Sequence, residues 1–180
     1  MLGMQLSHVP NVATAVLKDL LPTNIKAIEV DRNLTDDATA RAEVLDAINR
    51  GQKLVNYAGH GSASVWRGNL LTSADAASLS NGSSLSLFVS MTCQNGFFID
   101  PRSDSMAEAL MKSNAGAVAV WASTGMTSPS GQGLMDREVI RQLFAGGTIG
   151  QATARAKGAM LDTDVRRTWI LFGDPSARVR

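Results

Sequence analysis

The sequence is poor in the residues that form disulfides and metal sites. Its 180 residues include one cysteine, Cys93, and two histidines, His8 and His60. A single cysteine cannot form an intramolecular disulfide, and one Cys with two His does not supply the clustered ligands of a zinc site. We therefore expect no metal site and no bound cofactor. A single cysteine also does not indicate whether the protein works in an oxidising or a reducing compartment.

The sequence also lacks long hydrophobic runs and an excess of either charge. Its longest apolar runs, such as 116–122, are far shorter than the roughly 20 residues that a membrane helix needs. Seventeen basic residues are balanced by sixteen acidic ones, and the short arginine-rich stretches at 166–167 and 178–180 are typical of solvated ends. We expect no membrane span and no nucleic-acid partner. Residues 1–4 do not resemble a secretory signal.

What is present suits one domain with a buried core, since 44% of the residues are apolar and 18% are charged. Short apolar runs that suit strands alternate with segments of helical periodicity. The runs are continuous, so both faces of the strands are expected to be covered. The predicted fold class is α/β, a mostly parallel sheet with helices on both faces. The predicted strands are 25–30, 53–58, 85–91, 115–122 and 169–172. The predicted helices are 11–21, 37–49 (with Ala42, Leu45, Ala47 and Ile48 facing inward), 72–79, 105–113, 134–144 and 149–160.

His60 and Cys93 each follow the end of a predicted strand by two or three residues. Ligands of open parallel sheets bind at the carboxyl ends of the strands, and neighbouring strands lie about 4.8 Å apart. An imidazole and a thiol at two adjacent strand ends could act together on one carbonyl, as a cysteine hydrolase requires. Taken singly, each residue has an ordinary structural interpretation, a buried small side chain or a turn residue. His8 is interpreted as a surface residue.

The loops around these two residues add further candidates. Gly61 lets a backbone N–H approach a substrate oxygen, so the Gly61 and Cys93 amides could form an oxyanion hole. Trp66, Ser123 and Thr124 could line a substrate pocket, although core packing explains Trp66 equally well.

Three acidic residues have simpler structural interpretations. Asp100 follows the cysteine loop and is expected to cap a turn, with the binding of a basic substrate side chain as the alternative. Glu108 lies in an apolar helix and is expected to pair with a nearby group such as a backbone N–H. Asp174, in a Gly-Asp-Pro sequence, is expected to shape a turn.

Five blocks of the sequence resemble the gingipain-like cysteine peptidases of the caspase-like fold. They are KLVNYAGHGS at 53–62 followed by Trp66, VSMTCQNGF at 89–97, SMAEAL at 105–110, GAVAVWAST at 116–124 and LFGDP at 171–175. The resemblance covers about 38–176. It implies a caspase-like α/β/α sandwich and a cysteine-type endopeptidase. It also implies a polypeptide substrate and a secreted or cell-surface bacterial parent. The resemblance further implies that Cys93 forms a thioester, that His60 is the general base and acid, and that the Gly61 and Cys93 amides form the oxyanion hole.

Two departures from the family pattern lead to further expectations. The run 25–30 is the first clear strand, so the single domain at 1–180 is expected to lack N-terminal strands of the family domain. The carboxylate that orients the histidine would then be absent, or be replaced by Glu29 or Asp31. A sheet with a missing strand has an exposed edge, which the chain could use for homo-oligomerisation or cover with residues 1–22. No residue indicates a preference for arginine or lysine substrates.

Two other functions are alternatives to an active endopeptidase. A catalytically inactive scaffold, or a secretion or adhesion module of the same fold, would fit the missing strands. A hydrolase with a serine nucleophile is disfavoured because the sequence has no Gly-x-Ser-x-Gly elbow.

Overall fold

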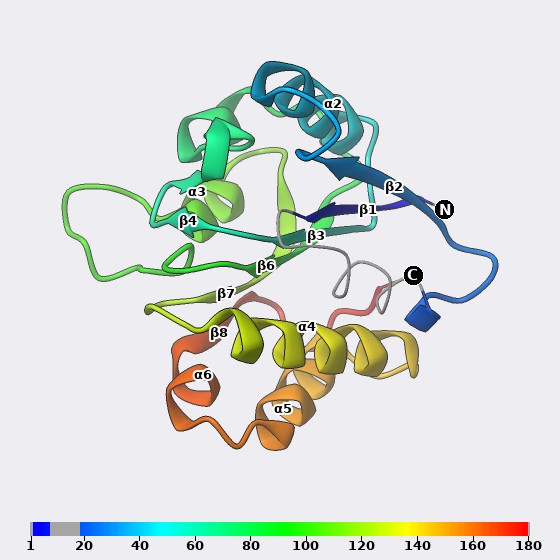
Figure 1. Ribbon diagram of the computed structural model, residues 1–180, viewed down its shortest axis with the longest axis vertical. Helices are drawn as coiled ribbons and strands as arrows, with labels where there is room; N and C mark the ends of the chain where they lie inside the picture. Colours follow the sequence, from blue (N-terminus) through cyan, green and yellow to red (C-terminus); the bar gives the residue numbers. More distant parts are fainter. Residues whose placement is uncertain (1, 8–18, 180) are drawn as a thin grey trace.

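The computed structural model of the chain describes residues 2–7 and 19–179, with side-chain surroundings from residue 19 onward. Its centre is a six-stranded sheet with the strand order β2-β1-β3-β6-β7-β8 (Figure 1). Strands β1 to β7 of this sheet run parallel, and β8 runs antiparallel to β7. A two-stranded antiparallel ribbon, β4–β5, follows β3. The strands are β1 Leu2–Ser7, β2 Lys26–Asp31, β3 Leu54–Ala58, β4 Gly61–Ser62, β5 Val65–Trp66, β6 Ser86–Met91, β7 Ala117–Ser123 and β8 Trp169–Gly173.

Helices cover both faces of the sheet, with α2 and α3 on one face and α4, α5 and α6 on the other (Figure 1). They are α2 Asp37–Asn49, α3 Met106–Lys112, α4 Pro129–Phe144, α5 Ile149–Ala159 and α6 Thr163–Thr168, with 3-10 turns at Arg67–Asn69 and Ser73–Ser78. The predicted fold class, a mostly parallel sheet with helices on both faces, is confirmed. The predicted helix at 11–21 lies largely outside the described residues.

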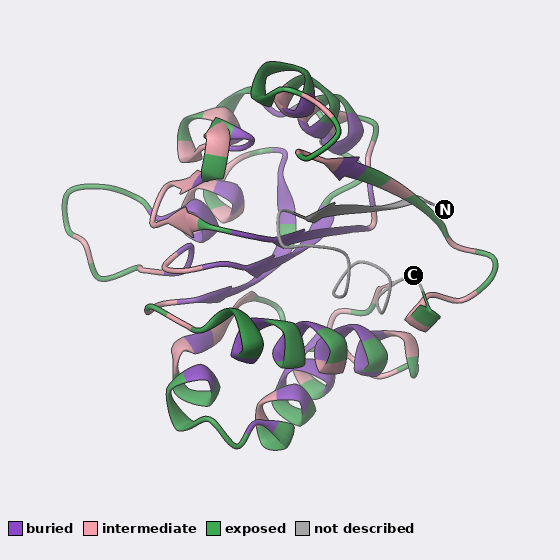
Figure 2. Cartoon of the chain, viewed as in Figure 1, coloured by how far each residue is buried: buried purple, intermediate pink, exposed green. Residues whose placement is uncertain are grey.

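Two hydrophobic cores lie on opposite faces of the sheet. Every residue of β3 and β6 is buried, which explains why their sequences are apolar or small except at Asn56 and Tyr57 (Figure 2). Alternate residues of each strand point to opposite faces. Val55, Tyr57 and Phe88 pack under α2 and α3, while Leu54 and Val89 pack under α4 and α5.

The strand β1 was not predicted, and the structure corrects the expectation that the run at 25–30 is the first strand. Its sequence, LGMQLS, contains no β-branched or aromatic residue, so its local strand propensity is weak. It is held on both sides, by β2 and by β3, with Gln5 opposite Glu29 and Asn56. Residues 2–7, in the segment 1–22, therefore form a strand beside β3. This matches one of the two expectations for an exposed sheet edge, namely that residues 1–22 cover it. In the described part of the chain, β2 is the outer strand at this side.

Helix predictions were right in position and partly wrong in detail. The α2 helix has the predicted bounds, and Asp36 caps it by accepting a hydrogen bond from the Thr39 amide at 2.9 Å. Ala42, however, is exposed and Leu45 is half-buried, because the inward stripe runs through Ala40, Val44, Ala47 and Ile48.

Two helices in the second half of the chain differ from the prediction. The α4 helix begins at Pro129, five residues before the predicted start, with Ser128 accepting a hydrogen bond from the Gly131 amide as its cap. The short helix α6 was not predicted, and its cap is Asp162.

Candidate active site

The His60 and Cys93 loops leave two adjacent strand ends. Strands β3 and β6 are hydrogen-bonded neighbours, with Ala58 opposite Met91. The Gly59 amide donates to the Met91 carbonyl at 3.1 Å, which extends the pairing one residue further. His60 and Cys93 each stand two residues beyond this register, His60 exposed and Cys93 half-buried. The predicted adjacency of the two strand ends is confirmed, whereas the chemical roles of the two residues stay predictions.

No hydrogen bond joins the imidazole to the thiol in the described part of the structure. Catalytic pairs without substrate are often separated in this way and close only around the bound substrate. The geometry therefore brings the two groups to one edge of the sheet in an open arrangement.

The backbone of His60 is fixed by residues on both sides of it. The Tyr57 hydroxyl donates to the His60 carbonyl at 2.6 Å, and the Arg67 amide donates to the same oxygen at 2.9 Å. Burial raises the pKa of Tyr57 to about 12, so this hydroxyl keeps its proton and stays a donor at neutral pH. Trp66 stacks on Tyr57 with ring centroids 4.2 Å apart.

Of the two interpretations of Trp66, pocket wall and core packing, the structure confirms core packing. Its side chain is fully buried in the core, where the indole lies beneath the loop that carries His60. The indole N–H donates to Asn95 Oδ1 at 2.6 Å. Trp66 therefore supports the site from inside, and its surface is not available to a substrate.

Asn95 joins the cysteine loop to the ribbon that follows His60. Besides accepting from Trp66, its amide nitrogen donates to the Ser62 carbonyl at 2.5 Å, and its backbone carbonyl accepts from the Ala107 amide at 2.9 Å. Asn95 is fully buried. Nothing in the local sequence pattern around Asn95 showed that this residue ties the two loops together.

Gly61 lies where a side chain would not fit. A Cβ atom at this position would stand 2.6 Å from Thr92 Oγ1 and 2.7 Å from the Val65 carbonyl oxygen. The backbone after His60 is therefore packed against the residue that precedes Cys93. The oxyanion-hole role of the Gly61 and Cys93 amides stays a prediction.

The cysteine loop is held in a sharp turn. Gln94 has a φ of 60°, a left-handed conformation that costs free energy in a residue with a Cβ and often occurs at functional sites. Its amide donates to the Gly125 carbonyl at 3.1 Å, the Gly96 amide donates to the Ser123 carbonyl at 2.9 Å, and the Phe97 amide donates to the Gln94 carbonyl at 2.9 Å. The end of β7 thus holds the loop from one side.

Ser123 and Thr124 shape the turn after β7. The Ser123 hydroxyl donates to the Gly125 carbonyl at 3.0 Å and accepts from its amide at 3.1 Å, and the residue is fully buried. The Thr124 hydroxyl donates to the Thr168 carbonyl at 3.0 Å. The expected pocket-lining role therefore does not fit Ser123, whose hydroxyl is used inside the protein. Thr124 is half-buried.

The first turn of α4 reaches the thiol. Cys93 Sγ lies 3.8 Å from the Thr127 carbonyl oxygen and 3.9 Å from Gln132 Nε2. Gln132 also donates to Thr127 Oγ1 at 3.0 Å and is almost fully buried. Gln132 was not predicted as a site residue, because the predicted helix begins at residue 134. The Ser128-Pro129 pair, a helix-start signal, could have revealed it.

One turn further along α4, a buried carboxyl faces the strand that leads to His60. The Asn56 side-chain amide donates to Asp136 Oδ1 at 2.6 Å. Asp136 is 1% exposed, and this burial raises the pKa of its carboxyl to about 7. The sequence did not single out either residue.

Neither proposed substitute for the orienting carboxylate lies on a strand next to β3. Both Glu29 and Asp31 belong to β2, which is separated from β3 by β1, so the strands are about 10 Å apart. Asp31 accepts from the backbone and side-chain nitrogens of Asn33, each at 2.8 Å. Glu29 is exposed.

The other three acidic residues have the structural contacts that the sequence predicted. Asp100 accepts from the Arg102 amide at 2.9 Å and so caps a turn. Glu108 accepts from the Ser105 amide and hydroxyl at 3.0 and 2.8 Å, which forms a capping box on α3. Asp174 accepts from the Ser176 amide at 2.8 Å.

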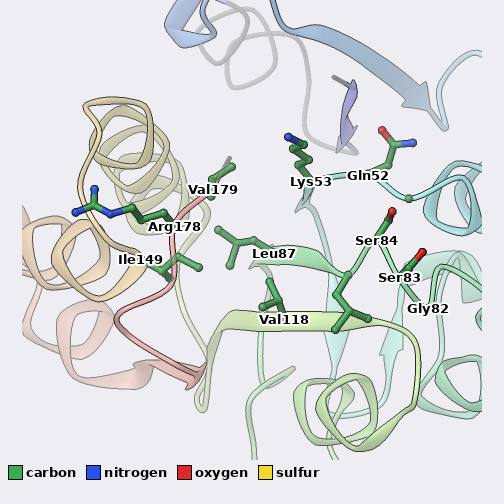
Figure 3. Close-up of a pocket in the computed structure, with 12 residues that line it drawn as sticks. Gln52, Lys53, Gly82, Ser83, Ser84, Leu87, Val118, Ile149, Arg178 and Val179 are labelled. Atoms are coloured by element: carbon green, nitrogen blue, oxygen red, sulfur yellow. The ribbon is translucent and has the colours of Figure 1, made fainter.

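A cavity of about 450 Å³ lies at the opposite end of the sheet from His60 and Cys93. It is bordered by the segments that enter β3 and β6 and by the C-terminal segment (Figure 3). Leu87, Val118 and Ile149 form its apolar wall, and Lys53 and Arg178 stand at its border. Its position at the amino ends of the strands separates it from the candidate active site.

Among the described helices, none has the length and apolar character of a membrane span.

Comparison with known proteins decides the family. The model of peptidase family C25 matches residues 6–180. The chain belongs to peptidase family C25. Gingipain R2 and gingipain R1 of Porphyromonas gingivalis are each 32% identical to it over 162 residues, which is 81% of this chain but 22% and 16% of those proteins.

Solved structures agree with this assignment. The crystal structure of the Arg-specific cysteine proteinase gingipain R superposes with a TM-score of 0.82 at 27% identity, over 99% of this chain and 47% of that one. The complex of the pro- and mature domains of Porphyromonas gingivalis RgpB gives a TM-score of 0.81 at 26% identity, over 99% and 48%. The C25 chain thus spans about half of these structures and has the caspase-like fold of the gingipains.

Proposed function

We propose that this family C25 chain carries the catalytic centre of a cysteine endopeptidase, with Cys93 as the nucleophile and His60 as the general base and acid. The observation that supports this most directly is the placement of both residues two positions beyond paired residues of adjacent parallel strands. The single cysteine of the chain stands at that edge, in a loop held in a strained turn.

The reaction would proceed in two steps. The Cys93 sulfur, after its proton passes to His60, attacks the carbonyl carbon of a peptide bond. The negative charge on the carbonyl oxygen is stabilised by the Gly61 and Cys93 amides. His60 then gives its proton to the leaving amine as the C–N bond breaks, which leaves a thioester on Cys93. Water, deprotonated by His60, hydrolyses the thioester and restores the thiol.

The substrate in this proposal is a polypeptide. A homologous gingipain structure is a complex of its mature domain with its own pro-domain, so the family fold binds polypeptide chains. The parent protein is proposed to act outside the bacterial cell, as its similarity to gingipains suggests. In the described part of the chain β2 is the outer strand of the sheet, and pairing of two copies along this side is proposed as the route to a homo-oligomer.

Covalent labelling at Cys93 is the first test. Because Cys93 is the one cysteine, mass spectrometry after iodoacetamide or an acyloxymethylketone probe reports on that residue alone. We expect the folded chain to react at pH 7 at least about 10-fold faster than the urea-unfolded chain, since a nearby imidazole favours the reactive thiolate. His60→Ala should remove most of this difference.

His8→Ala is the matched control, since His8 is the other histidine of the chain. This variant should label at the wild-type rate. Equal labelling rates for the wild type, the His60→Ala variant and the unfolded chain would overturn the proposal and favour the alternative of an inactive scaffold or adhesion module.

A further inference from the structure

The environment of the Cys93 sulfur contains one hydrogen-bond acceptor and one donor. The Thr127 carbonyl oxygen lies 3.8 Å from the sulfur, and Gln132 Nε2 lies 3.9 Å from it. A neutral thiol can donate its proton to the carbonyl, whereas a thiolate has no proton to donate and can only accept from the amide. These two contacts therefore favour different protonation states of the same sulfur.

Gln132 is held in place for this contact. Its amide nitrogen donates to Thr127 Oγ1 at 3.0 Å and lies 3.4 Å from the Thr127 carbonyl oxygen, so one N–H is anchored while the other can reach the sulfur. Its backbone amide donates to the Ser128 carbonyl at 2.9 Å in the first turn of α4. The residue is 8% exposed, so water competes little for its amide hydrogens.

The position of the Cys93 sulfur beside the start of α4 also favours a negative charge on the sulfur. The first turn of a helix carries backbone N–H groups without helical partners and a partial positive charge, which favour a nearby anion. Gln132 lies at the start of the 16-residue helix α4, and Thr127 precedes its N-cap, Ser128. The helix dipole favours a negative sulfur at this end, whereas the backbone N–H groups add little, because Pro129 has none and the Gly131 amide donates to Ser128 Oγ.

We propose that Gln132 is a positioning residue, whose side-chain amide donates a hydrogen bond to the Cys93 thiolate and holds the sulfur in place for attack. This inference rests on the proposed function. Gln132 acts through Cys93 and touches no substrate. In this arrangement the sulfur leaves the Thr127 carbonyl when its proton passes to His60, and the Gln132 amide then becomes its partner.

The test is the pH profile of Cys93 alkylation by iodoacetamide in the whole chain. Gln132→Met keeps the length of the side chain and removes the donor. We expect its alkylation midpoint to move to higher pH, with a rate at pH 7 about 3- to 10-fold below wild type. Gln132→Glu places a carboxylate at the same position and should slow alkylation at pH 7 by more than about 10-fold, because like charges repel.

Gln142→Met is the matched control. Gln142 lies on the same helix with the same 8% exposure, and its amide donates to Glu138 at 2.7 Å, away from the sulfur. This variant should keep the wild-type alkylation profile. Near-ultraviolet circular dichroism establishes that each variant is folded. If Gln132→Met does not fold, the Gln132→Glu profile decides, since the Thr127 hydroxyl, which accepts from Gln132 in the wild type, can instead donate to the glutamate carboxylate.

The outcomes separate this inference from the function on which it rests. A wild-type chain that labels no faster than the unfolded chain would remove the proposed function itself. An activated wild-type thiol that His60→Ala slows, but whose pH profile is unchanged in the folded Gln132 variants, would overturn the role of Gln132 and leave the proposed function intact.

Discussion

Cys93→Ala is expected to lower the rate of peptide hydrolysis by at least about 10³-fold, and His60→Ala by a similar factor. The two groups act on the same bond, so removing either one stops thioester formation. For the same reason the double variant should be no slower than the single variants, because residues that act as a unit are strongly non-additive. The measurement is kcat/KM on a fluorogenic peptide library, which makes no assumption about the preferred side chain.

Two controls make this result specific to His60 and Cys93. His8→Ala removes the other histidine and should leave kcat/KM unchanged. Thermal unfolding of each variant should stay within a few degrees of wild type, because His60 is exposed and Cys93 is half-buried at the edge of the sheet. A His60→Ala variant that hydrolyses peptides at the wild-type rate would exclude His60 as the base.

The placement of His60 and Cys93 was predictable because it depends on local features. Continuous apolar runs indicated β3 and β6, and parallel strands bring their carboxyl ends to one edge. The structure confirmed the prediction that the two strands are direct neighbours. The β1 strand could not be read from LGMQLS, because its pairing with β2 and β3 stabilises it despite a weak local propensity.

The supporting residues were hidden for a different reason. Gln132, Asp136 and Asn95 are polar, and in a sequence pattern polar residues on helices and loops indicate a solvated face. Their burial follows from tertiary packing of α4 and the cysteine loop against the sheet. The same effect explains why the sequence favoured a pocket position for Ser123 and left Trp66 open between pocket and core, while in the fold both are completely buried.

Asp136 offers a quantitative test of that hidden packing. Its carboxyl is fully desolvated against Asn56, and the one described hydrogen bond to it does not offset the cost of burying a charge. Desolvation raises the pKa of Asp136 from 3.8 to about 7. Between these values the folded chain binds a proton that the unfolded chain has released.

The sign of the pH dependence follows from this difference. The free energy of unfolding has its full contribution from Asp136 below about pH 4 and loses it as the pH rises to about 7, beyond which the loss is constant. Each pH unit in that window is equivalent to about 1.4 kcal/mol, so the three units give an upper limit of about 4 kcal/mol. Other groups titrate in the same range, so the comparison must be made against a variant that lacks this carboxyl alone.

Asp136→Asn supplies that comparison. Asparagine keeps the shape and the oxygen that accepts from Asn56, and it cannot ionise. We expect the variant to be more stable than wild type at pH 8 by about 1–4 kcal/mol, with the difference shrinking toward pH 4. Urea unfolding at several pH values measures the free energy of unfolding of both chains.

The exposed Asp174 provides the opposite control. Hydrogen bonds from Ser176 lower the pKa of Asp174, so Asp174→Asn should slightly destabilise the chain at neutral pH and have no stabilising effect at pH 8. If Asp136→Asn were less stable than wild type at every pH, with the two curves parallel, the Asp136 carboxyl would be ionised in the folded chain and matched by a donor. The inner face of α4 would then carry a fixed negative charge one turn from Gln132, and that charge would oppose formation of the Cys93 thiolate.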